Sequence, residues 1–213
     1  MLLGALALVI LALEFTADNQ QYAFQSYKHA FLAKNKGDSS VESYDEKKQW
    51  PGARLSWTSA DARRGFVTRG LWAYSRHPNC FCEQSFWWII NLIPLFAQPP
   101  PSAARIPLHH FTHALMHLDQ LKPLVASLFP DILYILPAAS LSLLFYSSTL
   151  FTESISKSKY PEAYAAYQKR VAMFDPSKTL RKSILHKFLR SEAEKKKIDN
   201  LVWGDVQGSK KTQ

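Results

Sequence analysis

Apolar residues in this chain are gathered into blocks that are separated by charged segments. The longest block, residues 130–151, contains one charged residue, Asp131. It is long enough to cross a bilayer, which takes about 20 residues. Two further apolar blocks cover residues 1–15 and 79–98. In such runs a helix satisfies every backbone polar group within the segment. The sequence therefore predicts an all-α integral membrane protein with two to three spanning helices plus cytosolic amphipathic helices.

Basic residues are distributed unevenly between these blocks, and the formal net charge is +9. Residues 16–83 hold ten Lys and Arg, residues 99–131 hold two, and residues 152–213 hold fourteen. Segments rich in Lys and Arg stay on the cytosolic side of a membrane. We therefore expect the first and third regions, including the C-terminus, to be cytosolic. We also expect two parts, a membrane domain over 1–176 and a basic tail over 177–213.

The tail has an apolar stripe beside basic residues, which is typical of a helix lying on an anionic membrane leaflet. The stripe consists of Leu180, Ile184, Leu185, Phe188 and Leu189. No nucleic-acid recognition motif accompanies the basic charge, so we expect the membrane and no nucleic acid as a partner. The end, Lys210-Lys-Thr-Gln213, resembles the dilysine retrieval signal. This predicts a multi-pass protein of the endoplasmic reticulum membrane.

The stretch Gly70–Glu83 places several polar side chains directly before an apolar run. Arg76, His77, Asn79 and Glu83 lie within it. Ionisable residues at the edge of a membrane segment mark a functional site by default. The plain alternative is an interfacial helix cap, in which Arg76 reaches lipid headgroups and Glu83 pairs with a lysine. The chemistry of the residues leaves both interpretations open.

Three blocks between residues 14 and 176 carry recognisable motifs. Ser75-Arg-His-Pro-Asn79, followed by Glu83, is similar to Ser-Arg-His-Pro-Asn-Tyr-Phe-Gly-Glu. Glu14–Phe24 is similar to Glu-x-x-Ala-Asp-x-Gln-x-x-x-Phe, and residues 151–176 form the third block. Together they resemble the C-terminal domain of the steroid 5-alpha-reductase family of membrane reductases. Sterol reductases and isoprenylcysteine methyltransferases are similar at Arg-His-Pro.

The resemblance implies an NADPH-dependent membrane oxidoreductase that reduces a carbon–carbon double bond of a steroid-like or enoyl lipid. It places cofactor contacts at five positions: Trp72, His77, Asn79, Glu83 and Tyr160. A guanidinium offers a planar fork to phosphate or carboxylate, so we add Arg76. Asp18 and Gln21, three residues apart on one helical face, are expected to orient the nucleotide or to brace Arg76, and the plain alternative is an amide-rich helix end. No residue is assigned as catalytic.

Two departures from the family pattern shape our expectations of activity. Cys80 and Cys82 stand where the family has Tyr and Gly, and glycine there allows close backbone approach. The chain also begins where the second half of the family begins. We therefore expect a truncated chain that binds NADPH weakly and turns over little. Two alternatives remain open: an S-adenosylmethionine-dependent lipid or isoprenylcysteine-type methyltransferase, and a non-catalytic membrane protein.

His109, His113 and His117 recur every four residues and so share one helical face. Such spacing is a known arrangement for metal-binding histidines. Membrane di-iron enzymes, however, carry many histidines in several clusters, and the family pattern has no counterpart to this segment. A wet interfacial helix face is our preferred interpretation, and we expect no metal.

Overall fold

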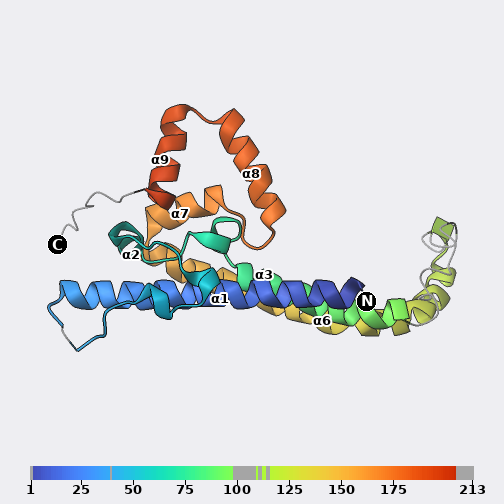
Figure 1. Cartoon of the computed structure of the whole chain (residues 1–213). Helices are drawn as coiled ribbons and strands as arrows, with labels where there is room; N and C mark the ends of the chain where they lie inside the picture. Colours follow the sequence, from blue (N-terminus) through green and yellow to red (C-terminus); the bar gives the residue numbers. More distant parts are fainter. Residues whose placement is uncertain (1, 39, 98–108, 110–111, 114–115, 205–213) are drawn as a thin grey trace. The chain divides into compact units, whose positions relative to one another are not determined.

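The computed structural model describes all residues except 1, 39, 98–108, 110–111, 114–115 and 205–213 (Figure 1). The described residues form helices and loops, with no strand among them. The α-helices are α1 (Leu2–Asn35), α2 (Ser59–Arg64), α3 (Pro78–Ala97), α6 (Leu118–Lys159), α7 (Pro161–Arg170), α8 (Pro176–Leu189) and α9 (Glu192–Trp203). Three 3₁₀ helices, η1 (Glu46–Lys48), η2 (Pro51–Ala53) and η3 (Gly70–Ala73), lie in the connections. The predicted all-α class is confirmed.

Two helices in the described part of the chain are long and apolar enough to cross a membrane. They are α1, which contains residues 2–15 of the first apolar block, and the Leu121–Lys159 portion of α6, which contains the block 130–151. Their length and composition indicate a membrane protein. The third block, 79–98, is helical over Pro78–Ala97 but does not meet the same criterion. A third span through α3 stays a prediction.

Helix α6 joins segments that the sequence analysis treats separately. It contains Pro123, Pro130 and Pro137. Membrane helices tolerate proline because neighbouring groups satisfy the freed carbonyls. The segment over 103–129, which contains the histidine row, lies partly outside the described residues, and from Leu118 onward it is continuous with the apolar block.

Helix α1 continues well beyond its apolar start, through residues that we expected to belong to a polar segment. Ala17, Ala23 and Phe24 are buried, so the polar half of α1 has a packed face. The helix ends at Asn35, and Gly37 follows with φ +76°. Glycine is favoured in this left-handed conformation, which commonly ends helices.

The described chain divides into two compact units. One comprises Met1–Leu11 and Glu83–Ser147, and the other comprises Ala12–Cys82 and Ser148–Gln213. The second unit contains most of the motif residues singled out from the sequence. Glu83 lies in the first.

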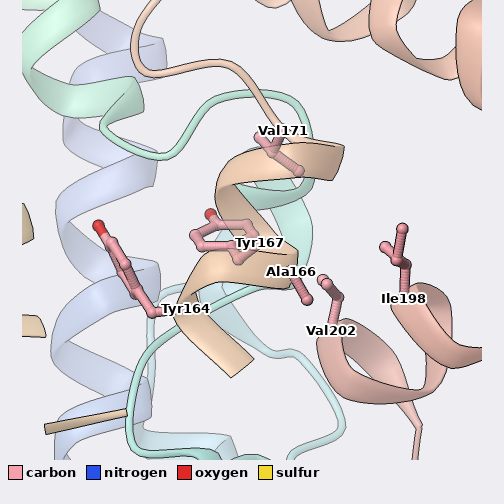
Figure 2. Close-up of a cluster of buried hydrophobic side chains, with 6 residues drawn as sticks. All are labelled: Tyr164, Ala166, Tyr167, Val171, Ile198 and Val202. Carbon is pink, nitrogen blue, oxygen red and sulfur yellow. The ribbon is translucent and has the colours of Figure 1, made fainter. Parts of the chain in front are cut away.

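The core of the second unit is formed mainly by α7 and α9 (Figure 2). Its buried members are Tyr164, Ala166, Tyr167, Val171, Ile198 and Val202. Tyr164 and Tyr167 are three residues apart, and Ile198 and Val202 are four apart, so each pair occupies one helical face. Residues expected to form a basic tail thus supply α8 and α9, although the domain boundary at 176/177 stays a prediction.

A buried ion pair lies within α2, and its arginine also bonds to the end of α9. Arg64 Nη1 lies 2.6 Å from Asp61 Oδ1, and these side chains are 0% and 2% exposed. The Arg64 guanidinium also donates to the carbonyls of Leu201 (3.1 Å) and Gly204 (2.7 Å). The charge of Arg64 is therefore compensated by one carboxylate and two helix-end carbonyls.

Asp61 has further partners that hold it ionised. Burial alone raises the pKa of a carboxyl group. Arg69 Nε lies 2.8 Å from Asp61 Oδ2, and the backbone and hydroxyl of Thr58 also donate to that oxygen. Together with Arg64 these donors outweigh the burial and lower the pKa of Asp61 below 3.8.

Gly65 ends α2 at a position that no other residue fits easily. Its φ is +86°, in the left-handed region. A Cβ at this position would lie 2.2 Å from the hydroxyl oxygen of Tyr160, and Lys28 Nζ donates to its carbonyl at 3.1 Å. Both the backbone angle and the space above it therefore require glycine.

We expect Gly65→Ala to destabilise the protein more than Gly37→Ala. Both glycines have positive φ, so both substitutions add backbone strain of about 1–3 kcal/mol. Only at Gly65 must the added Cβ displace a ring, because nothing lies within 4 Å at Gly37. Denaturant titration of both variants in detergent micelles measures the difference. Equal losses would show that the Tyr160 contact contributes nothing.

Candidate functional site

The centre of the candidate site is a buried ion pair between Arg76 and Glu153. Arg76 lies two residues before the start of α3, and Glu153 lies near the end of α6. Arg76 Nε is 2.6 Å from Glu153 Oε1, and Nη2 is 3.0 Å from Oε2. The side chains are 6% and 5% exposed. A two-point arrangement of this kind fixes orientation as well as charge.

Three more groups complete the hydrogen bonding of this pair. His77 Nε2 lies 3.1 Å from Glu153 Oε1, and Gln168 Nε2 donates to Oε2 at 2.8 Å. The third nitrogen of Arg76, Nη1, donates to the carbonyl of Val171. Buried charges persist only where their remaining donors and acceptors are satisfied. We call this set, Arg76, His77, Glu153 and Gln168, the Glu153 network.

Backbone hydrogen bonds hold the segment around Arg76 in register with the segment after α7. The amide of Arg76 donates to Ala172 O at 2.9 Å, and the amide of His77 donates to Met173 O at 3.0 Å. Ser75 Oγ also donates to Met173 O, at 3.1 Å. The chain entering α3 is thus fixed before its functional side chains are placed.

Two buried tyrosines pack on the same region. Tyr167 Oη donates to Trp72 O, which ties α7 to η3. Burial raises the pKa of Tyr167 well above 10.0, and burial likewise raises that of Tyr164. A phenol with a raised pKa keeps its proton at neutral pH. The Tyr167 hydroxyl therefore remains a donor to the Trp72 carbonyl.

On the α1 side, Gln20 and Trp72 make the main contacts. Trp72 Nε1 donates to Ala17 O at 3.1 Å. Gln20 accepts from the amide of Leu71 and donates to the carbonyl of Gly52, both at 2.9 Å. Trp72 is buried, so its indole serves the packing of η3 against α1. Its direct contact with a cofactor stays a prediction.

Asp18 and Asn79 form a polar pair beside these contacts. Asn79 Nδ2 donates to Asp18 Oδ1 at 2.9 Å. The other amide atom, Asn79 Oδ1, is buried and has no hydrogen-bond partner in the described part of the structure. Asp18 is exposed. A buried acceptor without a partner is uncommon in proteins and is a point at which a ligand donor can be accommodated.

The other residues singled out from the sequence lie in different surroundings. Gln21 is half-buried, and we find no side-chain hydrogen bond to it among the described residues. Tyr160 precedes α7, with its ring 5.8 Å from that of Phe66. Glu83 lies on α3 in the first unit, where it accepts from Trp87 Nε1 at 3.2 Å. Cofactor binding by each of them stays a prediction.

Arg76 and His77 were predicted as cofactor contacts, and the structure gives them internal partners. Each Arg76 nitrogen that carries a proton already faces Glu153 or Val171 O. Contact between Arg76 and a phosphate would break these bonds. The geometry therefore favours a supporting role for Arg76, in which it holds the neighbouring Asn79 in place.

Sequence reasoning did not single out Glu153, Gln168 or Gln20 as site residues. Gln20 matches the glutamine of the Ala-Asp-x-Gln motif, so the motif itself carried that signal. Glu153 is an acidic residue close to the end of an apolar helix, where a carboxylate needs a partner. Gln168 had no comparable signal, because its role depends on how α7 packs.

The described residues contain no group of three or more His, Cys, Asp or Glu arranged to hold a metal ion. Of the histidine row, the rings of His113 and His117 have centroids 4.4 Å apart. Cys82 is buried and Cys80 is half-buried, and neither forms a disulfide within the described residues.

Comparison with protein families gives a partial match. Residues 2–107 match the model of a family described as a protein of unknown function (DUF1295). It is a family of uncharacterised membrane proteins related to steroid 5-alpha-reductase-like proteins. Comparison with curated proteins and with solved structures found no significant match. The matched segment includes Asp18, Gln20, Trp72, Arg76 and Asn79, and it supports a membrane protein, while the specific reductase family stays a prediction.

Proposed function

We propose that this chain is an NADPH-dependent membrane oxidoreductase that reduces a carbon–carbon double bond of a steroid-like or enoyl lipid. The observation that carries the proposal is the convergence of three sequence blocks. Ala17, Asp18 and Gln20 bond to the segment around residues 71–79, and that segment bonds to Glu153 and residues 171–173. These are the blocks on which the resemblance rests, and apart from Glu83 they share one unit.

The residues of the Asp18–Asn79 pair fit the nicotinamide end of a nucleotide. A carboxamide carries an NH₂ donor, which matches the unpartnered Oδ1 of Asn79. The exposed Asp18 carboxylate can accept from a ribose hydroxyl. When bound, NADPH supplies the hydride, while the protein supplies orientation and electrostatics. Hydrogen bonds to the carbonyls of Ala172 and Met173 hold the backbone of residues 75–77, which directly precede the turn of α3 that carries Asn79.

The proposal predicts that Asn79→Ala weakens NADPH binding. Loss of one amide hydrogen bond costs about 0.5–1.5 kcal/mol, up to roughly tenfold in Kd. Binding is measured by NADPH fluorescence titration on the purified full chain in nanodiscs. Asn200→Ala is the matched control, because Asn200 is exposed on α9 and lies outside the site. The control should bind as the unmutated chain does.

Activity is tested by NADPH oxidation with a panel of enone steroids and enoyl lipids. Oxidation that depends on one of these substrates, and on Asn79, supports the reductase. Binding of S-adenosylmethionine at the same site, with no NADPH binding, would instead support the methyltransferase alternative. If the chain binds neither NADPH nor S-adenosylmethionine, the proposal is overturned.

We also propose that the protein resides in the endoplasmic reticulum membrane as a multi-pass protein with a cytosolic C-terminus. The uneven Lys and Arg distribution and the dilysine-like end support this orientation. Protease digestion of sealed microsomes tests it: an epitope tag placed upstream of the end should be cleaved without detergent. A protected tag would reverse the orientation.

A further inference from the structure

Helix α8 has an unusual orientation for a helix on the surface of a compact unit. Its polar side chains face the protein. Ala172 N donates to Thr179 Oγ1 at 2.8 Å, Arg170 Nη1 donates to Ser183 Oγ at 2.6 Å, and His186 is buried. These three residues follow one another at four and three positions, so they form one helical face.

The apolar face of α8 is the exposed one. Five large apolar side chains on this helix are between 51% and 77% exposed: Leu180, Ile184, Leu185, Phe188 and Leu189. A surface helix of a soluble protein normally turns its apolar stripe toward the core. Contiguous apolar patches that face outward mark an interaction site.

Charge identifies the partner that covers this face. Helix α8 contains no Asp or Glu, whereas Lys178, Arg181 and Lys187 lie beside the apolar stripe. We find no ion pair for these three residues in the described part of the chain. Lys182, in contrast, is turned inward and donates to Gln168 O at 2.7 Å. The outward surface is thus apolar along its centre and basic at its margins.

We propose that α8 lies in the surface of an anionic membrane leaflet, with its apolar stripe among the acyl chains and its lysines and arginine at the headgroups. Basic amphipathic helices with large apolar residues bind lipid in this manner. Each Lys or Arg near an anionic leaflet contributes to the attraction. The same chain carries two helices of membrane-spanning length, so a bilayer is present where the protein resides.

The inward polar contacts show that α8 is packed in a defined orientation and is not detached from the rest of the unit. Thr179 and Ser183 are bonded to residues at the end of α7, which fixes the rotation of α8 about its axis. The protein therefore presents the stripe rigidly. No refolding of α8 is required when the apolar side chains enter the bilayer.

A nitroxide at position 188 tests the proposal on the full chain in nanodiscs. The variant is Phe188→Cys, and Lys196→Cys on the exposed side of α9 is the control. Collisions with oxygen, which concentrates in lipid, are compared with collisions with a water-soluble nickel chelate. The unmutated chain, labelled identically, supplies the background from Cys80 and Cys82. In discs that contain phosphatidylserine, we expect the ratio of collisions with oxygen to collisions with the nickel chelate to be several-fold higher at position 188 than at position 196.

The second part of the experiment varies the charge of the lipid. In discs of phosphatidylcholine alone, the ratio at position 188 should fall toward that of the control. Arg181→Glu with Lys187→Glu should remove the effect of phosphatidylserine, whereas Lys196→Glu with Lys197→Glu, an equal change of charge on α9, should not. A nitroxide that stays aqueous in both disc types would overturn the proposal. A nitroxide that collides with neither oxygen nor the nickel chelate would also overturn the proposal, because it would indicate a protein partner or a second copy.

Discussion

Glu153→Ala is expected to lower the free energy of unfolding by about 3–5 kcal/mol, because it leaves the Arg76 guanidinium buried without its carboxylate. Arg76 is 6% exposed, so water cannot replace the lost partner. His77 and Gln168 lose the same acceptor. The measurement is a denaturant titration of the full chain in mixed micelles. Glu162→Ala, at an exposed position in the first turn of α7, should change the value by within about 0.5 kcal/mol.

A double variant separates the pair from the general effect of mutation at this position. Replacing a buried ion pair by apolar residues of similar volume is often neutral. Arg76→Met combined with Glu153→Leu should therefore be more stable than Glu153→Ala alone. The carbonyl of Val171 retains a donor in this variant, since Lys182 Nζ lies 3.1 Å away. If the double variant is the less stable of the two, the ion pair is not the source of the loss.

Asp61→Asn is the second substitution for which we expect a large effect, again about 3–5 kcal/mol at neutral pH. Asparagine keeps the shape of the side chain but removes the charge that compensates Arg64, whose side chain is 0% exposed. Arg69 loses its partner as well. Denaturant titration in micelles measures the loss of free energy of unfolding. Glu46→Ala is the control, because Glu46 is exposed in η1 and lies outside this ion pair.

The pH dependence of this second effect has a defined sign. Because the pKa of Asp61 is lowered on folding, its stabilisation is fully present above the unfolded value of 3.8. It is lost as the pH falls through the lower folded value. The difference in free energy of unfolding between the unmutated chain and Asp61→Asn should therefore decrease as the pH falls below 3.8. If this difference stays constant at low pH, the charge of Asp61 is not responsible for it.

The long helices were predictable because their signal is local. An apolar run of sufficient length specifies a helix without reference to the rest of the chain, as residues 130–151 do within α6. In the polar half of α1, the spacing of Asp18 and Gln21 predicted a helix locally. The extension of this helix to Asn35 was not predictable, because it depends on the burial of Ala17, Ala23 and Phe24, which the sequence does not reveal before the partner segments are placed.

In the candidate site, too, the residues with a local sequence signal were predictable and those that depend on packing were not. Arg76, His77 and Asn79 stood out because they form a contiguous motif at the edge of an apolar block. Glu153 is 77 positions from Arg76, and no local pattern links the two. The motif predicts Arg76 as a contact to a ligand, whereas the folded chain supplies an internal carboxylate, and cofactor binding by His77 and Asn79 stays a prediction.

The contact between Gly65 and Tyr160 restricts the order in which substitutions can accumulate in descendants of this chain. Any residue with a Cβ at position 65 meets the phenol oxygen of Tyr160. Replacing Tyr160 first by a shorter side chain removes this overlap, and the positive φ at position 65 then favours Asn or Asp among the residues with a Cβ. The two positions should consequently vary together among homologous proteins, with position 160 changing first.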